Sequence, residues 1–107
     1  MSTAIAEETL DLVFKALADS RRRRILDLLR EESLTTGALT LYFPELDRCT
    51  VMQHLGVLER AELVVSCRVG RSRVNTLNVG PLLEIQARWL GRFPASSLRL
   101  LDALRDG

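Results

Sequence analysis

The chain has 107 residues, of which 47% are hydrophobic and 27% are charged, and this composition is typical of one ordinary globular domain. Its 15 basic and 14 acidic residues leave a net charge of +1, which by itself indicates no nucleic-acid partner. No apolar run reaches the roughly 18–20 residues that a membrane helix needs, the N-terminus lacks a secretory pattern, and two cysteines form no disulfide framework. We therefore expect a cytoplasmic protein with reduced thiols and no membrane partner.

The charges are distributed unevenly along the chain. Residues 1–19 and 33–62 are net acidic, whereas residues 20–32 and 63–107 are net basic. Fourteen of the 15 basic residues are arginines, the side chain best suited to forked recognition of phosphate. The small overall charge therefore conceals two basic regions.

Apolar residues recur with helical spacing through the first half of the chain. This spacing predicts helices over about 7–18, 20–31, 36–42 and 48–61. Phe43-Pro44-Glu45 would end the third of these helices, because proline has no amide hydrogen and disfavours helix before it. Side chains that can cap a helix stand just before three of the predicted starts: Asp19, Ser33 or Thr35, and Asp47.

The pattern changes after Leu63. Residues 64–69 and 74–79 are rich in β-forming side chains, and the short glycine-containing segment between them predicts a hairpin. Gly80-Pro81 then favours the start of a helix that runs to about Phe93. Pro94 would break this helix, and a last helix is expected over residues 95–105.

The expected fold is mostly α with a two-stranded β-hairpin wing, in the order ααααββαα. Three helices followed by such a wing are typical of a winged helix-turn-helix. We expect a single domain over residues 1–107, in which residues 35–79 hold the helix-turn-helix and the wing. Residues 1–19 and 81–107 are predicted to be dimerisation helices, because their apolar surface exceeds what so short a chain can bury alone.

The helix over residues 48–61 is the expected recognition helix, because the second helix of a helix-turn-helix enters the major groove of DNA. Small and polar side chains gather on the face opposite Val51, Leu55 and Leu58. Glutamine can pair with adenine, and threonine can contact thymine. The same face would also suit plain exposure to solvent. The candidate DNA contacts on this helix are Arg48, Cys49, Thr50, Gln53 and His54.

The predicted wing carries three arginines within six residues, Arg68, Arg71 and Arg73, with no acidic residue beside them in the sequence. Arginine suits phosphate groups and narrow minor grooves. The alternative is a charged edge that prevents sheets from pairing with one another. We take all three arginines as candidate DNA contacts.

Four consecutive arginines occupy residues 21–24, at the start of a predicted helix, where they oppose the helix dipole. Such a conflict indicates compensation by a phosphate or by nearby carboxylates. We expect one or two of these arginines to pair with acidic residues and the others to meet the DNA backbone. The candidate acids are Asp19, Asp27 and Glu31 or Glu32, and the candidate DNA contacts are Arg22 and Arg23.

The sequence contains no recognisable catalytic arrangement. It has one histidine, no glycine-rich phosphate loop and no Ser/His/Asp set, so we expect no enzyme activity and no cofactor. Cys49, His54 and Cys67 match no compact zinc spacing, and no metal site is predicted. An alternative remains a thiol- or metal-responsive sensor that uses Cys49 and Cys67, since a thiol near a helix N-terminus can be activated.

Three segments resemble the ArsR/SmtB family of bacterial winged-helix transcriptional regulators. They are FKALADSRRRRILDLLREESLTTGALT, VMQHLGVLERAELV and VGRSRVNTLNVGPLLEI, which together span about residues 14–85. The tail, ARWLGRFPASSLRLLDAL, is similar to a branch of the family that senses no metal. The resemblance implies a homodimer, joined through its first and last helices, that binds an imperfect palindrome and usually represses transcription.

The implied dimer agrees with the excess of apolar side chains on the first and last helices. The candidate interface residues are Leu10, Val13, Phe14, Leu17, Leu82, Ile85, Trp89, Phe93, Leu101 and Leu104.

The sequence departs from the family at several positions. The third helix, residues 34–41, lacks the paired cysteines of many metal sensors. Other members of the family place metal ligands, histidine among them, on the helix that corresponds to residues 82–93, which contain no histidine here. Metal sensing by either of these two arrangements is therefore not implied. Asp47 and Met52 stand where the family often has serine, and Gly56 where it often has arginine. DNA contacts at these three positions are therefore not carried over.

These observations predict a sequence-specific, DNA-binding transcriptional regulator, a homodimeric repressor whose partner is double-stranded DNA. The sequence identifies no effector. The alternative of another class is a winged-helix module that binds protein and no DNA.

Overall fold

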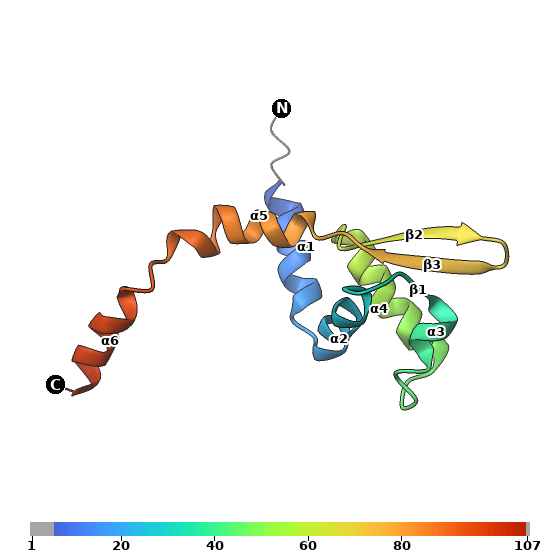
Figure 1. The fold of residues 1–107 in the computed structure, drawn as a ribbon, viewed down its shortest axis with the longest axis horizontal. Helices are drawn as coiled ribbons and strands as arrows, with labels where there is room; N and C mark the ends of the chain where they lie inside the picture. The colour runs from blue at the N-terminus through green and yellow to red at the C-terminus, as the bar shows by residue number, and fades with distance from the viewer. Residues whose placement is uncertain (1–5, 107) are drawn as a thin grey trace.

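The computed structural model describes residues 6–106 of the chain, and Figure 1 shows its fold. Helices α1 to α4 and the β-hairpin lie together, α5 lies beside α1, and α6 extends away from them (Figure 1). The elements, in chain order, are α1 (Glu7–Leu17), α2 (Ser20–Leu29), β1 (Leu34–Thr35), α3 (Thr36–Thr40), α4 (Arg48–Arg60), β2 (Val64–Val69), β3 (Ser72–Leu77), α5 (Gly80–Arg88), the 3-10 turn η1 (Leu90–Arg92) and α6 (Ser97–Asp106). No helix within residues 6–106 combines the length and apolar character needed to cross a membrane.

Three helices begin at side chains that accept hydrogen bonds from their first backbone N–H groups. Asp19 accepts from the amide of Arg21 at 2.8 Å, and Thr35 Oγ1 accepts from that of Ala38 at 3.0 Å. Asp47 accepts from the amide of Thr50 at 2.7 Å. These are the caps predicted from the sequence, with Thr35 rather than Ser33 at the start of α3.

The sheet has three strands in the order β1-β3-β2, where the sequence predicted two. Strand β1 was missed because two residues are too few for a periodic pattern to show. The buried side chain of Asn75 joins it to the hairpin: its Nδ2 donates to the carbonyl of Leu34 and to Thr36 Oγ1 at 3.2 and 3.1 Å, and its Oδ1 accepts from Ser66 Oγ at 2.7 Å. The wing is thus fastened to the helix-turn-helix.

The hairpin turn is shorter than predicted, because β3 begins at Ser72 and leaves only Gly70 and Arg71 between the strands. Gly70 has a φ of +61°, which glycine adopts at little cost, and a glycine at the first position of a two-residue turn suits a β-hairpin.

The hydrophobic core lies between α1, α2, α3, α4, the base of the hairpin and α5. Val13 and Ile85, which the sequence assigned to a dimer interface, are 0% and 3% exposed in the single chain and belong to this core. Side chains with so little exposed surface can bury almost none against a second copy. The prediction for these two residues is therefore wrong, because periodicity marks an apolar face without separating its inner from its outer edge.

The helix predicted to run to Phe93 ends earlier, and the chain continues through η1 into α6 (Figure 1). A Cβ at Gly91 would lie 2.7 Å from the carbonyl oxygen of Gln86, so this tight passage requires glycine. No residue of α6 is buried. The last helix therefore contributes nothing to the core of the single chain.

Asp19→Ala should lower the free energy of unfolding by about 1 kcal/mol at pH 7, because α2 loses the acceptor for two of its first amides. The side chain of Arg21 and the backbone amides of Arg21 and Arg22 hold the pKa of Asp19 well below its usual range. This stabilisation is present above the unfolded pKa of about 4 and is lost as the pH falls through the lowered folded pKa. Urea unfolding at pH 7 and pH 3 checks it. A stability difference between wild type and variant that is equal at both pH values would contradict this account.

Candidate nucleic-acid interface

Helices α3 and α4 form the helix-turn-helix, with Phe43 buried in the turn between them. The Phe43 carbonyl accepts a hydrogen bond from the amide of Leu46 at 3.0 Å, which closes the turn directly before the Asp47 cap. Helix α4 buries Val51, Leu55 and Leu58, as predicted. The turn and this apolar face together fix which side of α4 is turned outward.

The outward face of α4 carries most of the side chains that the sequence proposed for base contact. Arg48, Cys49 and Gln53 are exposed, and Thr50 is half-buried beside the cap. Hydrogen bonds from the backbone and side chain of Thr50 lower the pKa of Asp47, so this carboxylate is ionised at the helix start. The sequence has no acidic residue between Arg48 and Leu58. The first three turns of the exposed face are therefore neutral or cationic.

Arg60 was not among the predicted contacts. It is exposed in the last turn of α4, seven residues after Gln53, and its Nη1 lies 3.4 Å from where a Cβ at Gly56 would stand. A spacing of seven residues returns to the same side of a helix, and this spacing was the signal that could have found it.

His54 lies on the inner side of α4 and is 8% exposed. Its Nδ1 is 3.2 Å from Nη1 of Arg22. A ring in this position cannot reach DNA, so the predicted DNA contact of His54 is corrected to an internal contact with α2. The helical wheel placed His54 at the flank of the outward face, and the packing of α2 turned that flank inward.

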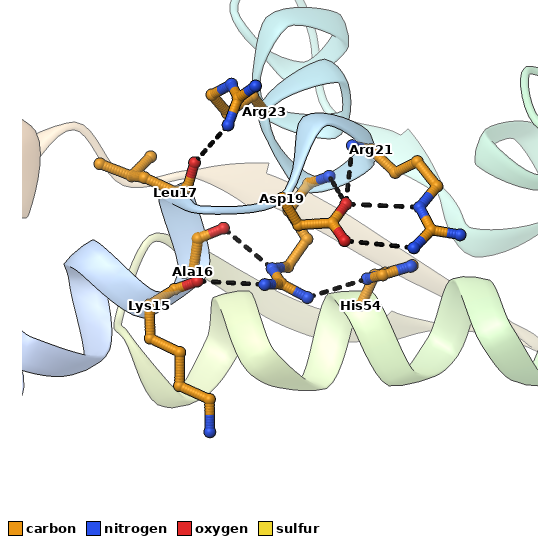
Figure 2. Close-up of polar contacts among 8 residues, drawn as sticks. Lys15, Ala16, Leu17, Asp19, Arg21, Arg23 and His54 are labelled. Atoms are coloured by element: carbon orange, nitrogen blue, oxygen red, sulfur yellow. Dashed lines mark hydrogen bonds and ion pairs between the residues drawn. The ribbon is translucent and has the colours of Figure 1, made fainter.

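Two of the four arginines at 21–24 are compensated by the end of α1 rather than by acids, and Figure 2 shows the contact of Arg23 with Leu17. Arg22 donates to the carbonyls of Lys15 and Ala16, and Arg23 donates to that of Leu17 at 2.7 Å. The last carbonyls of a helix lack partners and form its negative end, which attracts cations. Both guanidinium groups therefore cap α1. Arg22 is half-buried and Arg23 is exposed, and DNA contact by these two arginines stays a prediction.

The two remaining arginines of the run also have partners inside the chain. Arg21 pairs with Asp19 at 3.2 Å, as expected, and the guanidinium of Arg24 lies 5.4 Å from the centre of the Phe43 ring. The ion pairs found among residues 6–106 do not include the other predicted acids: Asp27, Glu31 and Glu32.

The wing presents its arginines in two ways. Arg71 is exposed at the tip, whereas Arg68 and Arg73 stand directly opposite each other on neighbouring strands. Arg73 donates to Glu59 of α4 at 3.0 Å, an acid that lies 14 residues away in the sequence. Like charges directly opposite on a sheet repel each other, so Arg68 and Arg73 together favour a nearby anion. Glu59 supplies one to Arg73.

Aromatic side chains link the outer surfaces of α1 and α5. Phe14 and Trp89 pack edge to face with ring centres 5.6 Å apart, and Trp89 and Phe93 do the same at 5.2 Å. All three are exposed, as are Leu101 and Leu104 of α6. The other predicted interface residues, Leu10, Leu17 and Leu82, are half-buried against the core.

The two cysteines are free and exposed, Cys49 on α4 and Cys67 on β2. In the described part of the chain, no three side chains of His, Cys, Asp or Glu gather into a group that could hold a metal ion.

Comparison with known proteins identifies the group to which this chain belongs. No family model matches it. The chain is 42% identical over 86 residues to the HTH-type transcriptional regulator YuzN of Bacillus subtilis (strain 168), an alignment that covers 75% of the chain and 94% of the relative. It is 33% identical over 81 residues to the transcriptional repressor SdpR of the same strain, covering 76% of the chain and 88% of SdpR. It is 40% identical over 100 residues to the HTH-type transcriptional regulator Rv2034 of Mycobacterium tuberculosis (strain ATCC 25618 / H37Rv), covering 90% and 92%.

Solved structures agree with these relatives. The crystal structure of the ArsR family transcriptional regulator RHA00566 superposes with a TM-score of 0.74 at 28% identity, covering 94% of this chain and 97% of that one. HlyU from Vibrio cholerae N16961 superposes with a TM-score of 0.63 at 28% identity, covering 79% and 90%. These relatives are regulators and not enzymes, as the sequence predicted, and they confirm the winged helix-turn-helix class. The chain belongs to the ArsR family of HTH-type transcriptional regulators.

Proposed function

We propose that this regulator is a homodimeric repressor in the cytoplasm that binds an imperfect DNA palindrome, with α4 of each subunit in the major groove. The observation that carries the proposal is the exposed face of α4, which has no acidic side chain between Arg48 and Leu58 and lies beside a cationic wing. The repressor role is supported by similarity to SdpR, a relative named as a transcriptional repressor. The exposed aromatic and leucine side chains of α1, α5 and α6 support the dimer.

Within this proposal, base edges are read by Gln53, Cys49 and Thr50, and phosphates are held by Arg48, Arg68 and Arg71. Gln53 is the central reader, because it is exposed in the second turn of α4 and its amide can donate to and accept from one adenine.

Gln53→Ala tests the proposed function. The variant should lose preference at one base position in each half-site, by about 1–3 kcal/mol per contact, while preferences at the other positions stay as in wild type. Gel shifts at fixed salt, with single-base variants of a duplex that the wild-type protein selects from a random pool, measure this. Loss of affinity spread equally over all positions would contradict base reading by Gln53, and failure of the wild-type protein to select any DNA would overturn the proposed function.

Arg71→Ala should weaken binding equally for all sequences, because a side chain at the wing tip holds phosphate rather than bases. The slope of log affinity against log salt should become less negative by about 0.9 for each phosphate that the variant no longer neutralises. Arg73→Ala is the matched comparison, since Arg73 is already paired with Glu59 and should change the slope less. A changed base preference with an unchanged salt slope would contradict the assignment of Arg71.

A further inference from the structure

One guanidinium at the corner between α1 and α2 has three partners on two other helices. Arg22 Nε donates to the carbonyl oxygen of Ala16 at 2.8 Å, and its Nη2 donates to that of Lys15 at 3.0 Å. Its Nη1 lies 3.2 Å from Nδ1 of His54, in the middle of α4. In Figure 2, dashed lines join the labelled Lys15, Ala16 and His54 to one unlabelled side chain, and these are the three contacts of Arg22. All three nitrogen atoms are in use, and a lysine ammonium could not reproduce this planar fork.

This contact determines the protonation state of the His54 ring. An arginine guanidinium only donates, so Nδ1 accepts and the ring is neutral with its proton on Nε2. Nε2 is buried, and residues 6–106 offer it no hydrogen-bond partner. Nothing else polar holds the ring, so the guanidinium of Arg22 is the one group among the described residues that fixes its orientation by hydrogen bonding.

We propose that Arg22 is a positioning residue for DNA binding: it ties His54 of the recognition helix to the end of α1 and so fixes the angle between the reading face and the dimerisation surface. Helix α1 carries the exposed ring of Phe14, and Gln53 stands next to His54 on α4. The inference rests on the proposed function. In a dimer, this angle sets the distance between the two recognition helices and therefore the half-site spacing that the protein accepts.

The contact between Arg22 and His54 is sensitive to acid, because a second proton on the ring would sit on Nδ1 and point at Arg22. Burial lowers the pKa of His54 below its ordinary value; Asp19 opposes this shift, and Arg21 and Arg22 add to it. The Lys15 side chain runs away from the ring (Figure 2). The remaining neighbours contribute little charge: α3 has no charged residue, the positions one turn away on α4 are uncharged, and β2 has only Arg68, which is exposed on the wing.

The pH dependence follows from the direction of this shift. A histidine whose pKa is lowered by folding is neutral at physiological pH, so DNA affinity should be constant above about pH 6.5 and should fall as the pH drops through the lowered pKa of His54. The chain has one histidine, so no other side chain of this type titrates in that range.

The test compares Arg22→Met with Arg23→Met, using duplex DNA selected by the wild-type protein. Both variants lose one positive charge and at least one bond to a carbonyl of α1, but only Arg22 contacts His54. Arg22→Met should lose at least about tenfold more affinity than Arg23→Met, and should discriminate less against a duplex with one extra base pair between its half-sites. Equal losses of affinity in the two variants would overturn only the positioning role of Arg22. A wild-type protein that selects no DNA would overturn the proposed function, and this role with it.

Two variants of His54 keep the inference testable if Arg22→Met fails to fold. His54→Asn retains an acceptor near the place of Nδ1 and cannot titrate, so its DNA affinity should stay within about threefold of wild type at pH 7.5 and should not fall at pH 5.5. His54→Leu removes the acceptor and should lose affinity as Arg22→Met does. Thermal unfolding at each pH separates loss of the fold from a change in the orientation of α4 within a folded chain. Acid sensitivity of DNA binding that persists in His54→Asn would overturn the inference.

Discussion

Leu101→Glu should lower the affinity for the DNA operator by roughly 100-fold or more while leaving the folded subunit intact. Leu98, Leu101 and Leu104 recur every three residues on α6, and all are 40% exposed or more in the single chain. They contribute nothing to the subunit core, so a charge at Leu101 leaves that core unchanged. In the proposed dimer the charge appears twice at the interface, and separated subunits lose the gain in effective concentration that binding two half-sites together provides.

Ala103→Glu is the matched control for this prediction. It adds the same charge to the same helix, but Ala103 lies about 200° around the helix from Leu101. Sedimentation equilibrium gives the mass of each variant, and gel shifts at one salt concentration give its affinity for DNA. If Leu101→Glu stayed a dimer, or if both variants lost affinity equally, the role of α6 in the assembly would be wrong.

Phe43→Ala should lower the free energy of unfolding by about 3–5 kcal/mol. Phe43 is 1% exposed and is among the largest fully buried side chains, and the guanidinium of Arg24 lies over its ring. Its removal leaves a cavity beneath the helix-turn-helix turn, whose closing hydrogen bond runs from the amide of Leu46 to the Phe43 carbonyl. A domain of this size has a total stability of about 5–15 kcal/mol, so this loss is a large part of it.

Tyr42→Ala provides the comparison, because the neighbouring aromatic ring is 43% exposed and should cost about 1 kcal/mol or less. Thermal unfolding should show a fall in Tm of about 12 °C or more for Phe43→Ala and only a few degrees for Tyr42→Ala. Similar shifts for the two variants would show that the turn is not anchored through Phe43.

Local features of the fold could be predicted because neighbouring residues determine them. The caps at Asp19 and Asp47 depend on hydrogen bonds that span only two or three positions. The buried stripe of α4 follows directly from its helical spacing. Strand β1 could not be predicted, since it exists only because residues some 40 positions later provide partners for its backbone and for Ser33.

The candidate site divides in the same way. The exposure of Gln53 follows from its angle on the helix, and its place could be predicted from the wheel. The partners of Arg22 and His54 could not, because they are brought together by the packing of α2 against α4 across 32 positions. The sequence shows that Arg73 is a cation near a turn, but only the fold places Glu59 beside it.

The four arginines of residues 21–24 show that a basic region can have partners within its own chain. Two cap the end of α1, one pairs with Asp19, and one lies over Phe43. Of the other candidate DNA contacts, Arg48 on α4 and Arg68 and Arg71 on the wing are exposed.

The central claim, that two copies of α4 read DNA together, is tested most directly by sequencing the duplexes that the wild-type protein enriches from a random pool. We expect an imperfect palindrome whose half-site centres lie one helical turn apart, about 10 base pairs, or a multiple of it. Enrichment of a single unrepeated half-site, or no enrichment at all, would contradict the claim.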